Sequence, residues 1–366
     1  MVPSRALTRH VLRCAPLSRM RTLCTATPPP PADDPLKSPD EGLLAKLDGT
    51  LNKSLPSFAN ETLTGVGQVI FLGSPACGAL TLGALMYGDL WLGTLAGIGA
   101  ATATAAAHAC RLDSGAISAG LMGYNGCLVG CAFSVFLGLP AWSPTALVAT
   151  LAGAAASAPL AAALKPACGS VPQFTLAFNF TTLAALCAVR PLAGAAAADP
   201  AGTISAMEWA CAPLVGISQI FVVNDALSGA AILGAIGLYS PMAAAHTLVG
   251  SCVGVGTALA CGAPAAEIGA GLWGFNPALT SLAVSVFFVP GAPSYVLATG
   301  GAAATSVLFG GAKVAMAGAF GVPALTLPFC AVAAGAHFLQ QANVPGLVLA
   351  AAPHSPEKNT PPPYVP

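Results

Sequence analysis

The chain has 366 residues, of which 55% are hydrophobic and only 7% are charged, and its mean hydropathy is +0.77. A soluble protein of this size has about a quarter charged residues, so the composition excludes a soluble fold and predicts an all-α polytopic membrane protein. A formal net charge of zero and the lack of a basic patch argue against nucleic-acid binding.

Both ends of the chain have a different composition from the centre. Of the 26 charged residues, 16 precede Gln68 or follow Ala350. Residues 1–55 are predicted to be a disordered, basic and proline-rich tail, and residues 351–366 a second disordered tail. The arginines before Asp33 are typical of an organellar transit peptide, whereas a basic cytoplasmic tail is the alternative. We therefore expect a plasma-membrane protein, with a mitochondrial or plastid membrane as the second possibility.

Apolar runs separated by Gly, Pro and charged residues predict about ten membrane segments, some of them half-helices. We expect a first membrane repeat over 60–195, a loop over 196–210 and a second repeat over 211–350. The expected segments are about 66–87, 90–110, 115–138, 142–164 and 174–195 in the first repeat, and 215–238, 241–262, 267–290, 294–318 and 323–350 in the second.

The two groups of segments are copies of each other at a constant offset of 151 residues. The matching pairs are VGQVIF (66–71) and ISQIFV (217–222), CGALTLGAL (77–85) and SGAAILGAI (228–236), GLMGYNGCL (120–128) and GLWGFNPAL (271–279), and FTLAF (174–178) and LTLPF (325–329). Because each copy has an odd number of segments, the second copy lies upside down relative to the first. The sequence thus predicts an inverted repeat with its permeation site near the midplane of the membrane.

The residues that recur in both copies are uncharged. They are a glutamine (Gln68, Gln219), an aromatic residue before an asparagine (Tyr124, Phe275) and a threonine (Thr175, Thr326). Aromatic faces and oxygen acceptors suit a neutral, flat, polar solute, although such residues can also serve only to hold helices together. The candidate ionisable groups Asp225, Glu267 and Lys313 do not recur, which argues against a proton or sodium relay. No nucleophile–base pair or metal-ligand spacing is evident, so we expect neither an enzyme nor a cofactor.

These motifs resemble those of the urea transporter family, whose two halves each carry a Gln or Glu motif, a G-[LW]-x-G-[FY]-N motif and a T-x-P-F motif. The resemblance covers about residues 60–345 and implies a homotrimer with one passive, channel-like urea pore through each protomer. It implies a narrow filter in which apolar slots stack on urea and a ladder of oxygens accepts its N–H groups. The slot residues it implies are Phe71, Tyr124, Leu128, Val222, Phe275 and Leu279; the midplane threonines are Thr175 and Thr326, and the side-chain oxygens are those of Gln68 and Gln219.

Three departures from the family pattern bear on selectivity. Ala177 replaces a proline in FTLAF, Tyr124 adds a hydroxyl to one slot, and Val222 is smaller than an aromatic residue. An aquaporin-type channel is suggested only by Asn276-Pro277-Ala278, and the first copy lacks the Pro and Ala. An ion-coupled transporter, or a channel for water, ammonia or glycerol, is the remaining alternative.

Overall fold

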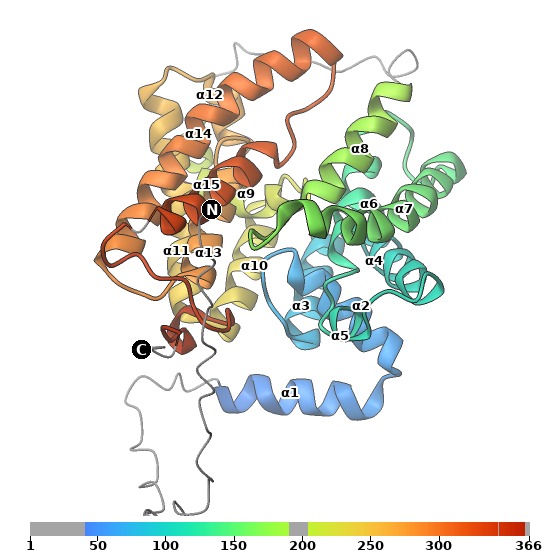
Figure 1. Cartoon of the computed structure of the whole chain (residues 1–366). Coiled ribbons are helices and arrows are strands. Elements are labelled where there is room, and N and C mark those ends of the chain that lie inside the picture. The colour runs from blue at the N-terminus through green and yellow to red at the C-terminus, as the bar shows by residue number, and fades with distance from the viewer. Residues whose placement is uncertain (1–40, 190–203, 343, 363–366) are drawn as a thin grey trace, which may run out of the picture. The chain divides into compact units, whose positions relative to one another are not determined.

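The computed structural model describes residues 41–189, 204–342 and 344–362. The expected basic tail up to residue 40 and most of the expected inter-repeat loop lie outside these residues. All regular elements in the described ranges are helices (Figure 1), as the composition predicts.

The first half of the chain contains eight of the described helices. They are α1 (Glu41–Ser54), α2 (Ser57–Gln68), α3 (Pro75–Gly88), α4 (Leu90–Ala109), α5 (Ser114–Ser118), α6 (Tyr124–Phe136), α7 (Pro144–Cys168) and α8 (Leu176–Val189). The second half contains α9 (Ala206–Ser218), η2 (Gln219–Phe221), α10 (Ala226–Tyr239), α11 (Pro241–Ala260), α12 (Ala265–Gly269), α13 (Phe275–Phe287), α14 (Ala292–Phe320), α15 (Leu327–Gln341) and η3 (Pro356–Lys358).

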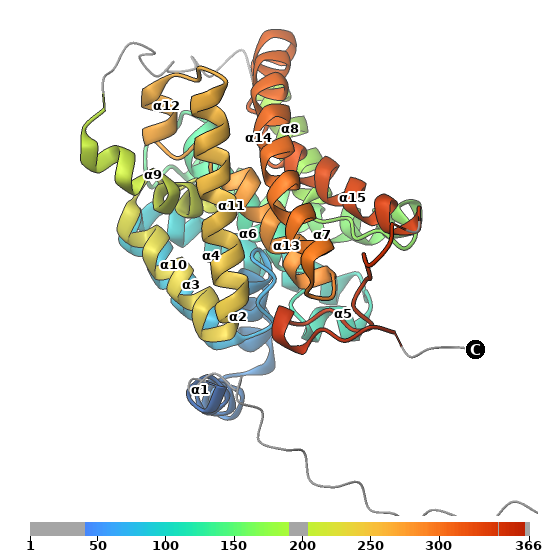
Figure 2. The same cartoon turned by 90° about the vertical axis from the view of Figure 1, so that its left-hand side faces the viewer.

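The helices repeat at the offset that the motifs predict. The bounds of α3, α4, α5 and α6 plus 151 residues are the bounds of α10, α11, α12 and α13. The helices α3 and α10 pack against each other where the two halves meet (Figures 1 and 2). The repeat is therefore a repeat of structure as well as of sequence.

Within the described ranges, four helices are long and apolar enough to cross a membrane: α4, α7, α11 and α14. The α9–η2 segment and α10 pass the same test only when taken together, and they are bent by 76° at the break between them, as in a broken span or a re-entrant loop. The shorter apolar helices α6, α8 and α13 have 13 or 14 residues, less than the ~20 that a full span needs. The prediction of full spans mixed with half-helices is thus confirmed.

Two expected segments are interrupted rather than continuous. Within 66–87 and 215–238 the chain turns sharply before a new helix begins at Pro75 or Ala226. Ser74 and Asp225 are the N-caps of these new helices, and each accepts a hydrogen bond from a backbone N–H in the first turn. Hydropathy averaged over a window of about 20 residues does not detect such a break, because only a few polar residues stand among apolar ones.

Glycines allow the closest helix contacts in both halves. A Cβ atom added at Gly78 of α3 would overlap with the carbonyl oxygen of Leu63 in α2, and one at Gly229 of α10 would overlap with that of Leu214 in α9. These two contacts are again 151 residues apart. Backbone-to-backbone approach of this kind is how small residues hold membrane helices together.

The N-terminal part of the described chain departs from the expected tail over 1–55. Residues 41–54 form α1, which contacts α3 and α10. Asp48 of α1 accepts hydrogen bonds from the Ser74 hydroxyl (2.8 Å) and the Ala76 N–H (3.0 Å). This carboxylate lies at the N-terminus of α3, where free N–H groups and the helix dipole favour a negative charge.

The expected C-terminal tail over 351–366 is likewise partly ordered, up to residue 362. Glu357 accepts from the Ser240 hydroxyl (2.6 Å) and the Met242 N–H (2.8 Å) at the start of α11. The buried Asn359 amide nitrogen lies within hydrogen-bond distance of the carbonyl oxygens of Ser285, Val286 and Phe288 at the end of α13. Both side chains satisfy backbone groups that a helix end leaves free, which composition cannot reveal.

The expected loop over 196–210 ends earlier than predicted. Helix α9 begins at Ala206, because Ser205 and Glu208 form a capping box: the Ser205 N–H donates to the Glu208 carboxylate (2.7 Å), and the Glu208 N–H donates to the Ser205 hydroxyl.

Candidate functional site

The two half-helices α6 and α13 are held in place by equivalent asparagines. The Phe178 N–H donates to the side-chain oxygen of Asn125 (3.0 Å), and the Phe329 N–H donates to that of Asn276 (3.2 Å). Both asparagines are fully buried. Each bond ties the start of a half-helix to the start of the following short helix, α8 or α15, so the four short helices meet in the interior.

The two predicted glutamines make equivalent contacts as well. The side-chain nitrogens of Gln68 and Gln219 donate to the carbonyl oxygens of Ala119 and Ala270, each over 2.8 Å. Because the NH₂ end of each amide points at the backbone, the opposite end presents its oxygen as an acceptor. This is the orientation that a solute with N–H donors requires.

Four large residues beside the half-helices have left-handed backbone conformations. Phe71 (φ 60°) corresponds to Val222 (φ 64°), and Phe174 (φ 49°) to Leu325 (φ 49°). A non-glycine residue in this region costs about 1–2 kcal/mol. Phe71 and Val222 lie in the turns that break the expected segments, and Phe174 and Leu325 directly precede the two predicted threonines. Strain of this kind persists where surrounding structure fixes the chain, and it is concentrated at functional sites.

The two halves differ at Tyr124 and its counterpart Phe275. In the second half, the Asn276 amide donates to the Leu325 carbonyl (3.0 Å). In the first half, the equivalent carbonyl of Phe174 accepts the Tyr124 hydroxyl (2.6 Å). The Tyr124 hydroxyl, expected to make the slot more polar, therefore has its hydrogen engaged with the backbone.

The two predicted midplane threonines contact each other. The hydroxyl oxygens of Thr175 and Thr326 are 2.7 Å apart, and both side chains are buried. Each threonine directly precedes a short helix, α8 or α15. The contact joins equivalent positions of the two halves, as residues on a two-fold axis must do.

An open cavity of about 620 Å³ approaches these threonines from one side. Four of the ten predicted site residues line it: Gln68, Phe71, Tyr124 and Thr175. The other six, Leu128, Gln219, Val222, Phe275, Leu279 and Thr326, are not in its lining. The structure thus brings four of the five first-half residues together around one space and buries most of the other six in the packed interior.

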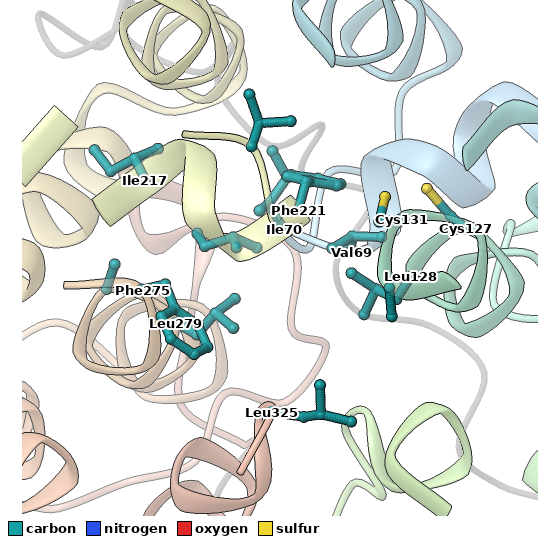
Figure 3. Close-up of a cluster of buried hydrophobic side chains, with 14 of the residues drawn as sticks. Val69, Ile70, Cys127, Leu128, Cys131, Ile217, Phe221, Phe275, Leu279 and Leu325 are labelled. Atoms are coloured by element: carbon teal, nitrogen blue, oxygen red, sulfur yellow. The ribbon is translucent and has the colours of Figure 1, made fainter. Parts of the chain in front are cut away.

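Figure 3 shows where several of the remaining residues lie. Leu128 of α6 and the pair Phe275 and Leu279 of α13 belong to one buried hydrophobic cluster, on opposite sides of the side chains of Ile70 and Phe221. Ile70 directly precedes Phe71, and Phe221 directly precedes Val222, so both lie at the breaks described above. Apolar slot residues of both halves therefore pack in one cluster with side chains from the breaks of the two interrupted segments.

The chain matches the family model described as "Urea transporter" over residues 59–341. It belongs to the urea transporter family. It is 30% identical over 287 residues to "Urea transporter 1" of Ovis aries, which covers 75% of this chain and 74% of that protein. The corresponding proteins of Rattus norvegicus (30% over 289 residues) and Mus musculus (29% over 286 residues) cover the same shares. Urea transport across a membrane is the activity of the family, whose members are transporters and not enzymes.

The ionisable candidates in this urea transporter have structural partners away from the threonine pair. Asp225 caps α10 by accepting from the Ser228 N–H (2.6 Å). Glu267 forms an ion pair with Lys313 and also accepts from the Trp273 indole N–H (3.0 Å). These contacts explain why the acids and the lysine are tolerated in an apolar chain.

Sequence reasoning about this urea transporter missed residues that contact the predicted ones. Asn179 bonds both threonines, and Cys330 lies 3.2 Å from the Thr175 hydroxyl. The rings of Phe287 and Phe329 pack edge-on against Phe71 in the wall of the cavity. Asn179 and Cys330 directly follow the FTLAF and LTLPF matches at the offset of 151, so extending each motif by one residue could have found them.

Proposed function

We propose that the chain conducts urea passively, as a channel, through a narrow slot in each protomer. The proposed pathway runs through the cavity beside Gln68 and Phe71 to the contact between Thr175 and Thr326. It then continues between the equivalent residues of the second half, Gln219, Val222, Phe275 and Leu279. The observation that carries the proposal is the direct contact of two equivalent threonine hydroxyls at the meeting point of two inverted halves.

The chemistry of the constriction supports a neutral solute. Among the described residues, the side chains of Thr175 and Thr326 have hydrogen bonds with each other, with Asn179 and with Cys330. None of these groups has a fixed charge. An ion entering here would lose its hydration shell without compensation, which costs far more than dehydrating a neutral molecule.

The same groups suit urea in particular. Urea has four N–H donors and one carbonyl acceptor, so the protein must supply several oxygen acceptors along the path. Gln68 presents one such oxygen, and the threonine hydroxyls supply two more. Apolar side chains such as Phe71, Leu128 and Leu279 offer flat surfaces for the faces of the molecule.

Urea flux into proteoliposomes, measured by stopped-flow light scattering, tests the proposal. We expect urea entry well above that of protein-free liposomes, saturating weakly and unchanged by a proton or sodium gradient. Entry at the rate of empty liposomes would reject urea conduction. Flux that depends on either gradient would favour the ion-coupled alternative, and equal rates for water, ammonia or glycerol would favour a less selective channel.

We further propose that the protein assembles as a homotrimer in the plasma membrane. The resemblance to the family supports the trimer. Helix α14 also exposes the apolar side chains of Val296, Val307 and Val314, which need lipid or another subunit to cover them. Native mass spectrometry in detergent tests the trimer. A fluorescent C-terminal fusion tests the location, and an organellar signal would favour the transit-peptide interpretation of residues 1–32.

A further inference from the structure

The two halves differ at the residue that follows the midplane threonine by four positions. Asn179 in the first half corresponds to Cys330 in the second. Both side chains are buried next to the threonine pair, and Asn179 is fully inaccessible to solvent. The repeat is therefore asymmetric in hydrogen-bonding capacity at its narrowest point.

Asn179 holds Thr326 by two bonds at once. Its side-chain nitrogen donates to the Thr326 hydroxyl oxygen (2.9 Å), and its side-chain oxygen accepts from the Thr326 N–H (3.2 Å). Its second N–H donates to the Thr175 carbonyl (2.8 Å). The amide thus has every strong donor and acceptor engaged, which fixes its orientation.

Cys330 makes the weaker contact on the other side. Its sulfur lies 3.2 Å from the Thr175 hydroxyl and 3.8 Å from the Asn179 nitrogen. A thiol is a weak donor and a weak acceptor, so it cannot orient a hydroxyl as an amide does. At one end of the network the amide of Asn179 is a strong hydrogen-bond donor. At the other end the sulfur of Cys330 is a weak acceptor of a hydroxyl hydrogen bond.

From this asymmetry we infer that Asn179 is a positioning residue that sets the direction of the hydroxyl bonds in the constriction. The N–H of Asn179 occupies one acceptor site of the Thr326 oxygen. The Thr326 hydroxyl then donates to Thr175, and the Thr175 hydroxyl donates toward Cys330. In this direction each threonine oxygen keeps a lone pair for a solute N–H, and neither hydroxyl hydrogen points at the solute.

The opposite direction would be unfavourable for the same solute. If Thr175 donated to Thr326, the Thr326 oxygen would already accept two bonds, and its own hydrogen would point into the pathway. A donor would then face the N–H groups of urea. Asn179 therefore favours solutes rich in N–H donors over those of the same shape with fewer, an inference that rests on the proposed urea pathway.

The test compares urea with acetamide, a planar molecule in which a methyl group replaces one NH₂ group. The variants are Asn179→Cys, which makes the two halves alike, and the swap Asn179→Cys with Cys330→Asn. By the repeat symmetry, an asparagine at 330 would hold Thr175 as Asn179 holds Thr326. Fluxes of both solutes are measured in proteoliposomes of the full chain, with thermal unfolding in detergent as the check on folding.

We expect Asn179→Cys to lower urea flux about tenfold and acetamide flux much less. Urea has more N–H donors than acetamide, so it loses more when an acceptor oxygen is no longer correctly oriented. The swap is expected to restore the urea-to-acetamide ratio to within about twofold of the wild type, because a bond of equal strength orients the network from the other side. Unchanged urea flux in Asn179→Cys would overturn the inference. So would a proportional loss of both solutes that the swap does not reverse, because that is the mark of a merely structural residue.

Two further outcomes distinguish a failure of the positioning role from a failure of folding or of urea conduction. If Asn179→Cys does not fold, the swap alone decides: a wild-type flux ratio supports positioning, and a reduced ratio contradicts it. If the wild-type chain itself conducts no urea, the proposed function fails, and the failure is visible before any variant is compared.

Discussion

The Tyr124 hydroxyl donates to the backbone carbonyl of Phe174 over 2.6 Å, and this carbonyl corresponds by the repeat to that of Leu325, which the Asn276 amide bonds instead. One backbone acceptor is thus satisfied by two different side chains in the two halves. As a consequence, the side-chain nitrogen of Asn125 is buried without a hydrogen-bond partner among the described residues. The unpaired N–H group of Asn125 could bond the Phe174 carbonyl in place of the Tyr124 hydroxyl, so the difference between the two halves can be tested by mutation.

We predict that Tyr124→Phe is well tolerated. Removing the hydroxyl lets the Asn125 amide turn to the Phe174 carbonyl, as Asn276 does in the second half, so the free energy of unfolding falls by less than about 1 kcal/mol. The reverse change, Phe275→Tyr, adds a hydroxyl where the Leu325 carbonyl is already bonded and costs about 1–3 kcal/mol. Thermal unfolding in detergent compares the two, and equal losses would contradict the exchange of partners.

We predict that Thr326→Val lowers urea flux about tenfold, because the loss of one acceptor oxygen adds ~1.4 kcal/mol to the barrier for a dehydrated solute. Thr182→Val is the matched control. Thr182 lies on α8 and is fully buried, but its hydroxyl has no hydrogen-bond partner among the described residues. Stopped-flow flux distinguishes the two variants; a comparable effect of both, or none from Thr326→Val, would remove Thr326 from the filter.

Close helix packing gives a third prediction with paired controls. Gly78→Ala and Gly229→Ala each force a methyl group against a backbone carbonyl, so each is expected to destabilise the protein by at least about 1–3 kcal/mol. Gly83→Ala and Gly234→Ala lie on the same two helices, α3 and α10, where an added Cβ meets no atom within 4 Å. These should be neutral or slightly stabilising, since alanine favours helix more than glycine does.

Thermal unfolding of all four variants checks this third prediction. If the variants at the crowded positions, Gly78 and Gly229, unfolded with the same free energy as those at the open positions, the helices would be able to move apart at little cost.

The fourth prediction concerns the C-terminal segment. Asn359→Ala leaves three carbonyl groups at the end of α13 without their side-chain partner and is expected to cost about 1–3 kcal/mol. Thr360→Ala is the control, because Thr360 is exposed and its described bond, from the Ala351 N–H, uses only its backbone oxygen. Resistance to limited proteolysis near residue 350 provides the measurement. Equal cleavage of both variants would contradict an anchoring role.

Much of the fold could be predicted from the sequence, because hydropathy and the offset of 151 residues report directly on spans and on their repetition. Interrupted helices were expected, but the exact positions of the breaks near Phe71 and Val222 could not be predicted, since each turn depends on one apolar residue in a left-handed conformation. The sequence also did not predict that residues 41–54 and 351–362 adopt a defined structure. Their polar side chains, Asp48 and Asn359 among them, pair with helix ends that only the three-dimensional structure brings close.

The candidate site was predictable to the extent that its residues recur. The glutamines and threonines stand in both copies, and they make equivalent or mutual contacts in the structure. Asn179 and Cys330 directly follow the matched motifs and could have been included by position, but recurrence alone does not select them because the two copies differ there. The function of such a pair depends on the difference itself, which becomes visible only when both side chains are seen beside one pair of hydroxyls.

The bond between Asn359 and the end of α13 also constrains the order in which the protein is assembled during synthesis. Asp48 is made before α3, so the cap of that helix in the first half is ready as soon as the helix emerges. The second half differs, because Asn359 follows its partners by 71 to 74 residues and leaves the ribosome only after α14 and α15. The N-terminus of α3 therefore has its Asp48 partner available before that helix is made, whereas the end of α13 gains its Asn359 partner only after two further helices have been translated.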